Sequence, residues 1–152
     1  MVIEYLVIYQ AIVNNNTPLY SHISNYFQSG NMSKLKIMIV DDEVDICNLF
    51  RDALQVAGYN VRAFTNPTEA LEDFRLHNEE YGVIITDIRM PEMSGIELIK
   101  RVNQINKNVK VFLMTAFELK NEELQELKMN EFLNKPIYAQ RLVEMVKRYI
   151  PI

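Results

Sequence analysis

Three carboxylates stand side by side where the first regular apolar run of this sequence ends. Asp41, Asp42 and Glu43 directly follow Ile37–Val40 in the stretch KIMIVDDEVD. Neighbouring like charges repel, by about 4 kcal/mol per pair at 4 Å in a surface-like dielectric. A cation held beside them would offset this repulsion. Taken singly, the acids have a simpler interpretation, because aspartate also stabilises the start of a helix.

Three more reactive groups end later apolar runs. Asp87 ends GVIITD, Thr115 ends VKVFLMT, and Lys135 follows EFLN. Each one alone fits an ordinary turn residue, a strand residue or a solvated lysine. With the first acids they make a set of carboxylates, a hydroxyl and an ammonium group. This set suits Mg²⁺, which binds one or two carboxylates together with phosphate oxygens. A carboxylate beside the metal can then take up a phosphoryl group.

Two alternating patterns fill the chain between these residues. Short apolar runs predict buried strands at Ile37–Val40, Val61–Phe64, Gly82–Asp87, Val109–Thr115 and in EFLNKP. Helical spacing predicts five helices between and after them, which begin near Ile46, at the caps Asn66 and Ser94, and at Glu118 and Tyr138. The first should end at Gly58, and the third should bury Ile96, Ile99, Val102 and Ile105.

Five strands that alternate with helices predict an α/β fold with a doubly wound, five-stranded parallel sheet. Ligands of such sheets bind beyond the carboxyl ends of the strands, where the strand order switches. The reactive groups should therefore meet at one edge of the sheet. Their meeting there, rather than any one residue, is what favours a pocket that can be phosphorylated.

Composition restricts the class of protein. The chain has 152 residues, 49% of them hydrophobic and 24% charged, with a net charge of −4. This charge balance gives no sign of a basic surface that would bind nucleic acid or an anionic membrane. One cysteine, Cys47, allows neither an internal disulfide nor a cysteine zinc cluster. We expect a cytoplasmic protein that does not insert into membranes.

The first 33 residues differ from the rest. Residues 1–13 are apolar but too short to span a bilayer, and residues 14–33 are polar with no periodicity. Met32 then opens a stretch that looks like an ordinary protein start. We expect residues 1–33 to be an extension or linker and residues 34–152 to be the folded domain. Two interpretations of the extension stay open: a dispensable leader, or an arm that docks on the domain or on a partner.

Four motifs resemble the receiver domain of two-component response regulators. They are VDDEVD, IITDIRMPEMSG, LMTAF and FLNKP, and the resemblance covers about Lys36 to Ile150. It implies a flavodoxin-like (βα)5 fold in which Asp87 accepts a phosphoryl group from a histidine kinase or phosphotransfer protein. The metal ligands that it implies for Mg²⁺ are Asp42, Asp87 and the backbone carbonyl of Arg89, with Asp41 assisting.

The resemblance also implies how the signal would leave the pocket. Thr115 and Phe132 would form a switch pair, and Lys135 would precede a cis bond to Pro136. Because the sequence stops at Ile152, we expect a stand-alone receiver of the chemotaxis type. It would signal to a separate protein through the fourth helix, Glu118–Lys128, the fifth strand and the last helix. It would not be an enzyme beyond self-phosphotransfer and autodephosphorylation.

Other classes of function fit less well. A flavin- or nucleotide-binding domain needs Gly, Ser or Thr after the first strand to cradle a phosphate, which DDEVD would repel. A degenerate receiver that serves only as an interaction module would typically lack an acid or the lysine, and this chain has all of them. That module remains the alternative, and a magnesium-dependent phosphohydrolase is a weaker one.

Overall fold

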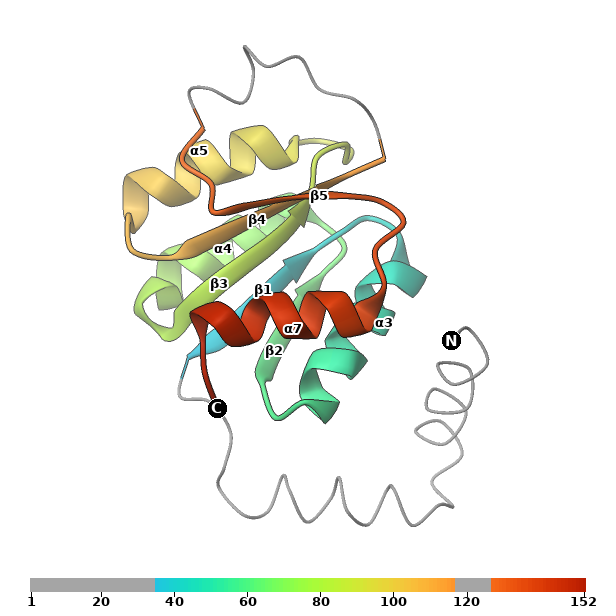
Figure 1. The fold of residues 1–152 in the computed structure, drawn as a ribbon. Helices are drawn as coiled ribbons and strands as arrows, with labels where there is room; N and C mark the ends of the chain where they lie inside the picture. Colours follow the sequence, from blue (N-terminus) through green and yellow to red (C-terminus); the bar gives the residue numbers. More distant parts are fainter. Residues whose placement is uncertain (1–34, 117–126) are drawn as a thin grey trace. The chain divides into compact units, whose positions relative to one another are not determined.

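The computed structural model describes residues 35–116 and 127–152 (Figure 1). The expected extension over residues 1–33 lies outside the described residues. So does the helix expected over Glu118–Lys128, except for Leu127 and Lys128, which are not helical. The chain divides into two units, Met1–Met32 and Ser33–Ile152, and all described residues belong to the second.

One parallel sheet organises the described residues. Its five strands are β1 (Lys36–Val40), β2 (Asn60–Phe64), β3 (Tyr81–Asp87), β4 (Lys110–Thr115) and β5 (Glu131–Asn134). They pair in the order β2-β1-β3-β4-β5, and every neighbouring pair is parallel. The order switches direction between β1 and β3, which confirms the predicted doubly wound α/β fold. Val40 of β1 is the sheet partner of Thr86 of β3, so the residues after both strands emerge side by side.

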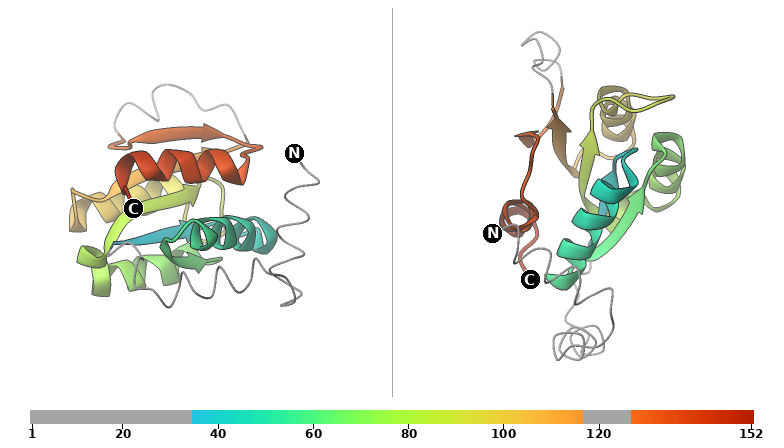
Figure 2. Two further views of the ribbon diagram at one scale, coloured as in Figure 1. Left: turned by 60° about the horizontal axis from the view of Figure 1, so that its bottom comes forward. Right: turned by 90° about the vertical axis from the view of Figure 1, so that its right-hand side faces the viewer.

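Helices cover both faces of this sheet. Among the described residues they are α3 (Val44–Val56), α4 (Pro67–His77), α5 (Gly95–Ile105) and α7 (Ala139–Tyr149), with a short 3-10 turn at Asn78–Glu80. Figures 1 and 2 show α3 and α7 on one face and α4 and α5 on the other. Because these four helices lie on the faces of the sheet, none of them covers the carboxyl ends of the strands.

The two predicted helix caps, Asn66 and Ser94, are present. The side chain of Asn66 accepts hydrogen bonds from the backbone N–H groups of Thr68 and Glu69, at 2.7 and 3.1 Å. The hydroxyl of Ser94 accepts one from the N–H of Glu97 at 3.1 Å. Each bond satisfies a donor that the first helical turn leaves without a partner.

The helix α5 corrects one expectation about the core. Leu98, Ile99 and Val102 are fully buried, whereas Ile96 is half-buried and Ile105 is 38% exposed. The buried stripe is thus centred about one residue away from the predicted one. Ile105 is the last residue of the helix, where the chain turns away and no further helical turn covers the side chain.

Tyr59 joins the beginning of β2 to the end of the chain. The helix α3 ends at Val56, two residues before the Gly58 that was predicted to stop it. The φ of 95° at Gly58 lets the N–H of Tyr59 return to the carbonyl of Leu54 at 3.0 Å. The Tyr59 side chain is fully buried, and its hydroxyl donates a hydrogen bond to the carbonyl of Ile150 at 2.8 Å. Burial raises the pKa of this hydroxyl.

Replacing Tyr59 with phenylalanine should lower the free energy of unfolding by about 1 kcal/mol, because it leaves the Ile150 carbonyl without its donor. Urea unfolding followed by circular dichroism measures this difference. Tyr149→Phe is a comparison, because its hydroxyl bonds Glu131 at a half-exposed position, and it should cost less. An unchanged urea midpoint for the Tyr59 variant would show that the bond contributes nothing.

Candidate functional site

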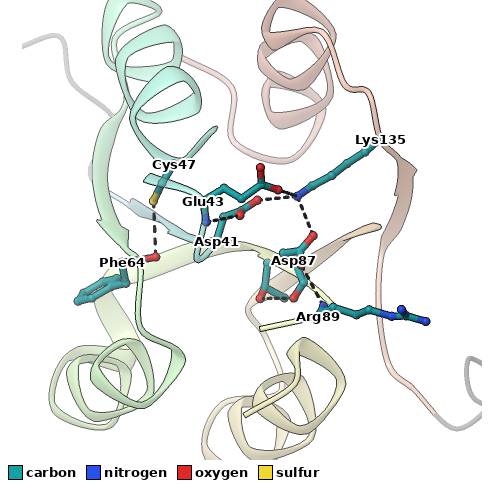
Figure 3. A network of polar contacts seen from close by, with 8 residues as sticks. Asp41, Glu43, Cys47, Phe64, Asp87, Arg89 and Lys135 are labelled. Carbon is teal, nitrogen blue, oxygen red and sulfur yellow. Dashed lines mark hydrogen bonds and ion pairs between the residues drawn. The ribbon is translucent and has the colours of Figure 1, made fainter. Parts of the chain in front are cut away.

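An ammonium group and two carboxylates meet at the carboxyl end of the sheet (Figure 3). The Nζ of Lys135 lies 2.8 Å from Oδ2 of Asp41 and 2.8 Å from Oδ1 of Asp87. Asp41 follows β1, Asp87 is the last residue of β3, and Lys135 follows β5. The pairing of β1 with β3 sets the two acids side by side, at the switch in strand order. The predicted meeting of these three residues is therefore present.

Asp41 has two roles in the structure. Its Oδ1 accepts the backbone N–H of Glu43 at 3.0 Å, next to the start of α3, while its Oδ2 accepts from Lys135. The bond to Glu43 is not a helix cap, because Glu43 is itself the N-cap of α3 and no side chain caps that helix, so the helix-cap interpretation of Asp41 is wrong. The contact with Lys135 places Asp41 beside the predicted site residues. Its side chain is fully buried, and this burial raises the pKa of Asp41 although the bonds from Lys135 and the Glu43 amide oppose the rise.

Lys135 is the shared partner of the two buried acids. Burial disfavours its charged form, but the hydrogen bonds to Asp41 and Asp87 outweigh burial and raise the pKa of Lys135. The group is therefore an ammonium at neutral pH. At their formal charges, two carboxylates against one ammonium make this group of three side chains negative. Such a group attracts a second cation.

The phosphoacceptor candidate is held through both of its oxygens. Oδ1 of Asp87 accepts from Lys135, and Oδ2 accepts the backbone N–H of Arg89 at 2.9 Å. The residue is buried, with 8% of its surface exposed, and it stands at the carboxyl end of β3. The carbonyl of Ile88 accepts the N–H of Gly95 at 2.8 Å, which closes the loop between β3 and α5 behind this carboxylate.

The structure places the remaining predicted site residues around this centre. Asp42 is exposed beside Asp41. Thr115 is buried at the end of β4, and its carbonyl accepts the backbone N–H of Lys135 at 2.7 Å. Phe132 is half-buried on β5 and packs against the hydrophobic core. The peptide bond from Lys135 to Pro136 is cis, as predicted.

Glu43 is a member of the pocket that the sequence motifs did not assign. Its Oε1 lies 3.6 Å from Nζ of Lys135, and its side chain is 66% exposed (Figure 3). An exposed pair at this distance contributes little to stability. The third consecutive acid after β1 was the signal for it, but the direction of its side chain depends on how α3 leaves the strand.

Metal donors are available, although no ready-made cage is present. Over residues 35–116 and 127–152, no three Asp, Glu, His or Cys side chains are arranged to hold a metal ion. Lys135 takes one oxygen of Asp41 and one of Asp87. Magnesium needs only one or two carboxylates, with water and phosphate oxygens completing its shell. The hard oxygen donors at this edge fit that requirement.

Cys47 is next to the pocket but does not line it. It is buried, and its thiol donates to the carbonyl of Phe64 at 3.5 Å (Figure 3). Burial raises the pKa of this thiol. The group is thus a packed, protonated side chain and not a nucleophile.

A five-stranded parallel sheet with acids and a lysine at its switch point is the architecture of a receiver-type α/β domain. Residues 37–147 match the family model described as response regulator receiver domain. The chain therefore belongs to the response regulator receiver family, whose members are switches in two-component signal transduction.

Relatives of full domain length support this assignment. The chain is 32% identical over 117 residues to the response regulator receiver protein CpdR of Brucella abortus, which covers 76% of the chain and 96% of CpdR. It is 32% identical over 123 residues to sporulation initiation phosphotransferase F of Bacillus subtilis, covering 80% and 98%. By contrast, it spans 26% of transcriptional regulatory protein ZraR of Salmonella typhimurium.

Solved structures agree on the fold. The response regulator TrrA of Thermotoga maritima, in complex with Mg²⁺ and BeF, superimposes with a TM-score of 0.68 at 33% identity, over 76% of this chain and 99% of TrrA. Chemotaxis protein CheY4 of Vibrio cholerae gives a TM-score of 0.69 at 28% identity, over 78% and 100%. Outside residues 1–34 and 117–126, the chain has no helix of the length and apolarity that a membrane crossing needs.

Proposed function

We propose that this chain is a phosphorylation-controlled switch that takes a phosphoryl group onto Asp87 from a histidine kinase or phosphotransfer protein. The observation that carries the proposal is the carboxylate of Asp87, held by Lys135 at 2.8 Å and by the Arg89 amide at 2.9 Å. These two contacts fix the carboxylate at the carboxyl end of the sheet, beside the carboxylate of Asp41. Membership in the receiver family supports the same chemistry.

The reaction would be an in-line displacement at phosphorus. A carboxylate oxygen of Asp87 forms the new P–O bond, and the P–N bond to the donor imidazole breaks with its electron pair left on nitrogen. Lys135 would then hold one oxygen of the transferred group, and Thr115 would donate to another. Thr115 ends β4, which lies next to β3 in the sheet, and Lys135 follows β5, which lies next to β4.

The proposal includes Mg²⁺. Asp42, Asp87 and the backbone carbonyl of Arg89 would hold it, with Asp41 assisting. When bound, the metal would neutralise charge on the phosphoryl oxygens as they approach the carboxylates. The negative formal charge of Asp41, Asp87 and Lys135 together supports this assignment, and the Mg²⁺ named in the TrrA complex belongs to that relative.

Intact-protein mass spectrometry tests the proposed function. After incubation with acetyl phosphate and Mg²⁺, the protein should gain the mass of one phosphoryl group. The gain should be lost when EDTA is present and when hydroxylamine, which cleaves acyl phosphates, is added afterwards. A protein whose mass stays unchanged under conditions that label another receiver would favour the alternative, a degenerate interaction module.

Replacing Thr115 with alanine should separate phosphorylation from signalling. The variant should still accept phosphate on Asp87, because the carboxylate keeps its contacts with Lys135 and Arg89. It should lose most of the phosphate-dependent gain in affinity for a downstream partner, since no hydroxyl would draw β4 toward the phosphoryl group and free space for Phe132 to turn.

The partner would read this change on β5 and α7 and on the segment 118–128, most of which lies outside the described residues. Partner affinity and phosphate content are measured on the same sample, by pull-down with and without acetyl phosphate. Full retention of the affinity gain in the Thr115→Ala variant would mean that the signal leaves by another route. Serine at this position is the control, because it keeps the hydroxyl and should keep the gain.

We further propose that residues 34–152 form the receiver domain, that it works in the cytoplasm, and that its only catalysis is self-phosphotransfer and autodephosphorylation. A chain that begins at Met32 should then unfold within about 2 kcal/mol of the full-length chain, since residues 14–31 offer little apolar surface to bury. Urea unfolding of both chains checks this. A larger loss would show that the first 13 residues dock on the domain.

A further inference from the structure

Glu92 ties the loop after the phosphoacceptor candidate to the start of α4. Its Oε2 accepts a hydrogen bond from Nδ2 of Asn66 at 3.1 Å and lies 3.3 Å from the donating hydroxyl of Thr68. Asn66 is also the residue whose Oδ1 caps α4. The carboxylate therefore lies at the helix N-terminus, where the helix dipole favours negative charge. We call these three side chains, of Glu92, Asn66 and Thr68, the Glu92 clip.

The backbone at Glu92 adopts a conformation that its residue type does not favour. Its φ is 67°, which makes it the one residue other than glycine with positive φ among the described residues. The N–H of Met93 donates to the carbonyl of Pro91 at 2.7 Å, so Glu92 is the central residue of a γ-turn of the rarer, strained hand. Glycine or asparagine would be easier to accommodate there. The contacts of the carboxylate help to hold the turn in place.

This turn is close in sequence to the groups that contact the phosphoacceptor candidate. Only Met90 and Pro91 lie between Arg89 and Glu92 in the loop that joins β3 to α5. The far end of the same loop is fixed by the bond from Gly95 to Ile88. A shift at the turn would therefore be passed to Arg89, whose N–H holds Asp87 at 2.9 Å.

We propose that Glu92 is a positioning residue for phosphoryl acceptance: through the clip it sets where the backbone of Arg89 stands relative to Asp87. The consequence for phosphorylation rests on the proposed function. The consequence for the Arg89 amide does not, because it concerns a hydrogen bond between two residues of the chain itself.

A swap of donor and acceptor tests the clip without removing the helix cap. Aspartate caps a helix about as well as asparagine, so N66D keeps the start of α4. It replaces the Nδ2 donor by a charged oxygen that faces the Glu92 carboxylate. E92Q alone should have a small effect, because its amide can still accept from Asn66. The double variant N66D/E92Q restores a donor and an acceptor with reversed polarity.

Two quantities are measured on each variant. The first is the exchange rate of the Arg89 amide hydrogen, by NMR and without phosphodonor. The second is the Mg²⁺ concentration that gives half-maximal phosphorylation by acetyl phosphate. In N66D we expect each to rise on the order of two- to tenfold, the usual worth of one hydrogen bond, and in the double variant to return close to wild type. E72Q, which removes another exposed carboxylate of α4, should change neither.

The outcomes separate the two proposals. If wild-type protein takes no phosphate, the proposed function fails, and the Arg89 exchange rate still decides the role of the clip. A drop in the urea midpoint of N66D with Arg89 exchange unchanged would make the clip merely structural. Unchanged Arg89 exchange in N66D, or no recovery in the double variant, overturns the inference.

Discussion

Replacing Lys135 with methionine should lower the free energy of unfolding at pH 7 by about 3 kcal/mol, because removing one partner of a buried charge pair leaves the other uncompensated. The ammonium now lies 2.8 Å from each of Asp41 and Asp87, and Asp41 is fully buried. Methionine keeps most of the apolar length of the side chain, so the change removes charge more than packing.

The loss should shrink in acid. The pKa of Asp41 is already raised by burial in the wild-type fold, and removal of the lysine takes away a contact that lowers it. A group whose pKa is raised by folding favours the folded state below its unfolded pKa, and this contribution disappears as the pH rises through the folded value. The penalty in the variant should therefore be largest at neutral pH and should fall as the pH approaches the ordinary aspartate value of 3.8.

Urea unfolding at both pH values measures this effect. Lys147→Met is a matched control, since that lysine is exposed on α7, and it should change stability by less than about 0.5 kcal/mol. If Lys135→Met were as stable as wild type at pH 7, or lost more stability in acid than at neutral pH, the account of the buried charges would be wrong.

Replacing Gly95 with alanine should cost about 3 kcal/mol or more, at the upper end of what overpacking costs. A Cβ built at this position would stand 2.0 Å from the carbonyl oxygen of Asp87 and 2.9 Å from its carbonyl carbon. Both are backbone atoms of the residue proposed to accept phosphate, so neither can rotate away. The β3–α5 loop would have to move, and phosphorylation should fall together with stability.

Gly82→Ala is the matched control for this prediction. Its Cβ would meet only side-chain atoms, from Ile150 at 2.7 Å and from the partly exposed Leu35 at 3.0 Å. These side chains can adjust, so we expect a cost below about 1 kcal/mol. Thermal or urea unfolding of the two variants gives the comparison. Equal losses in both would show that the contact with Asp87 is not what fixes glycine at position 95.

The sequence was sufficient to predict the parallel sheet and the meeting of Asp41, Asp87 and Lys135. Apolar runs that are buried on both faces, separated by amphipathic helices, allow few other folds. In a doubly wound sheet the ends of such runs meet where the strand order switches. The position of these residues in the site therefore follows from the order of elements, without knowledge of any distance.

Finer features of the site depend on tertiary geometry that periodicity does not report. The run of three acids gives no signal that Asp41 is buried and bonded to Lys135 while Asp42 is exposed. The approach of Glu43 to Lys135 depends on the angle at which α3 leaves β1. The strained turn at Glu92 is equally hidden, because glutamate gives no local signal for positive φ.

Mapping the phosphoryl group by tandem mass spectrometry is the most direct test of the central claim. After incubation with acetyl phosphate and Mg²⁺, borohydride reduction marks the modified aspartate before digestion. We expect the mark on Asp87 alone, no mark in Asp87→Ala and none with EDTA. Asp45→Ala, which removes an exposed acid in the first turn of α3, should be marked normally. Equal labelling of the Asp87→Ala variant, or labelling that EDTA leaves unchanged, would contradict the central claim.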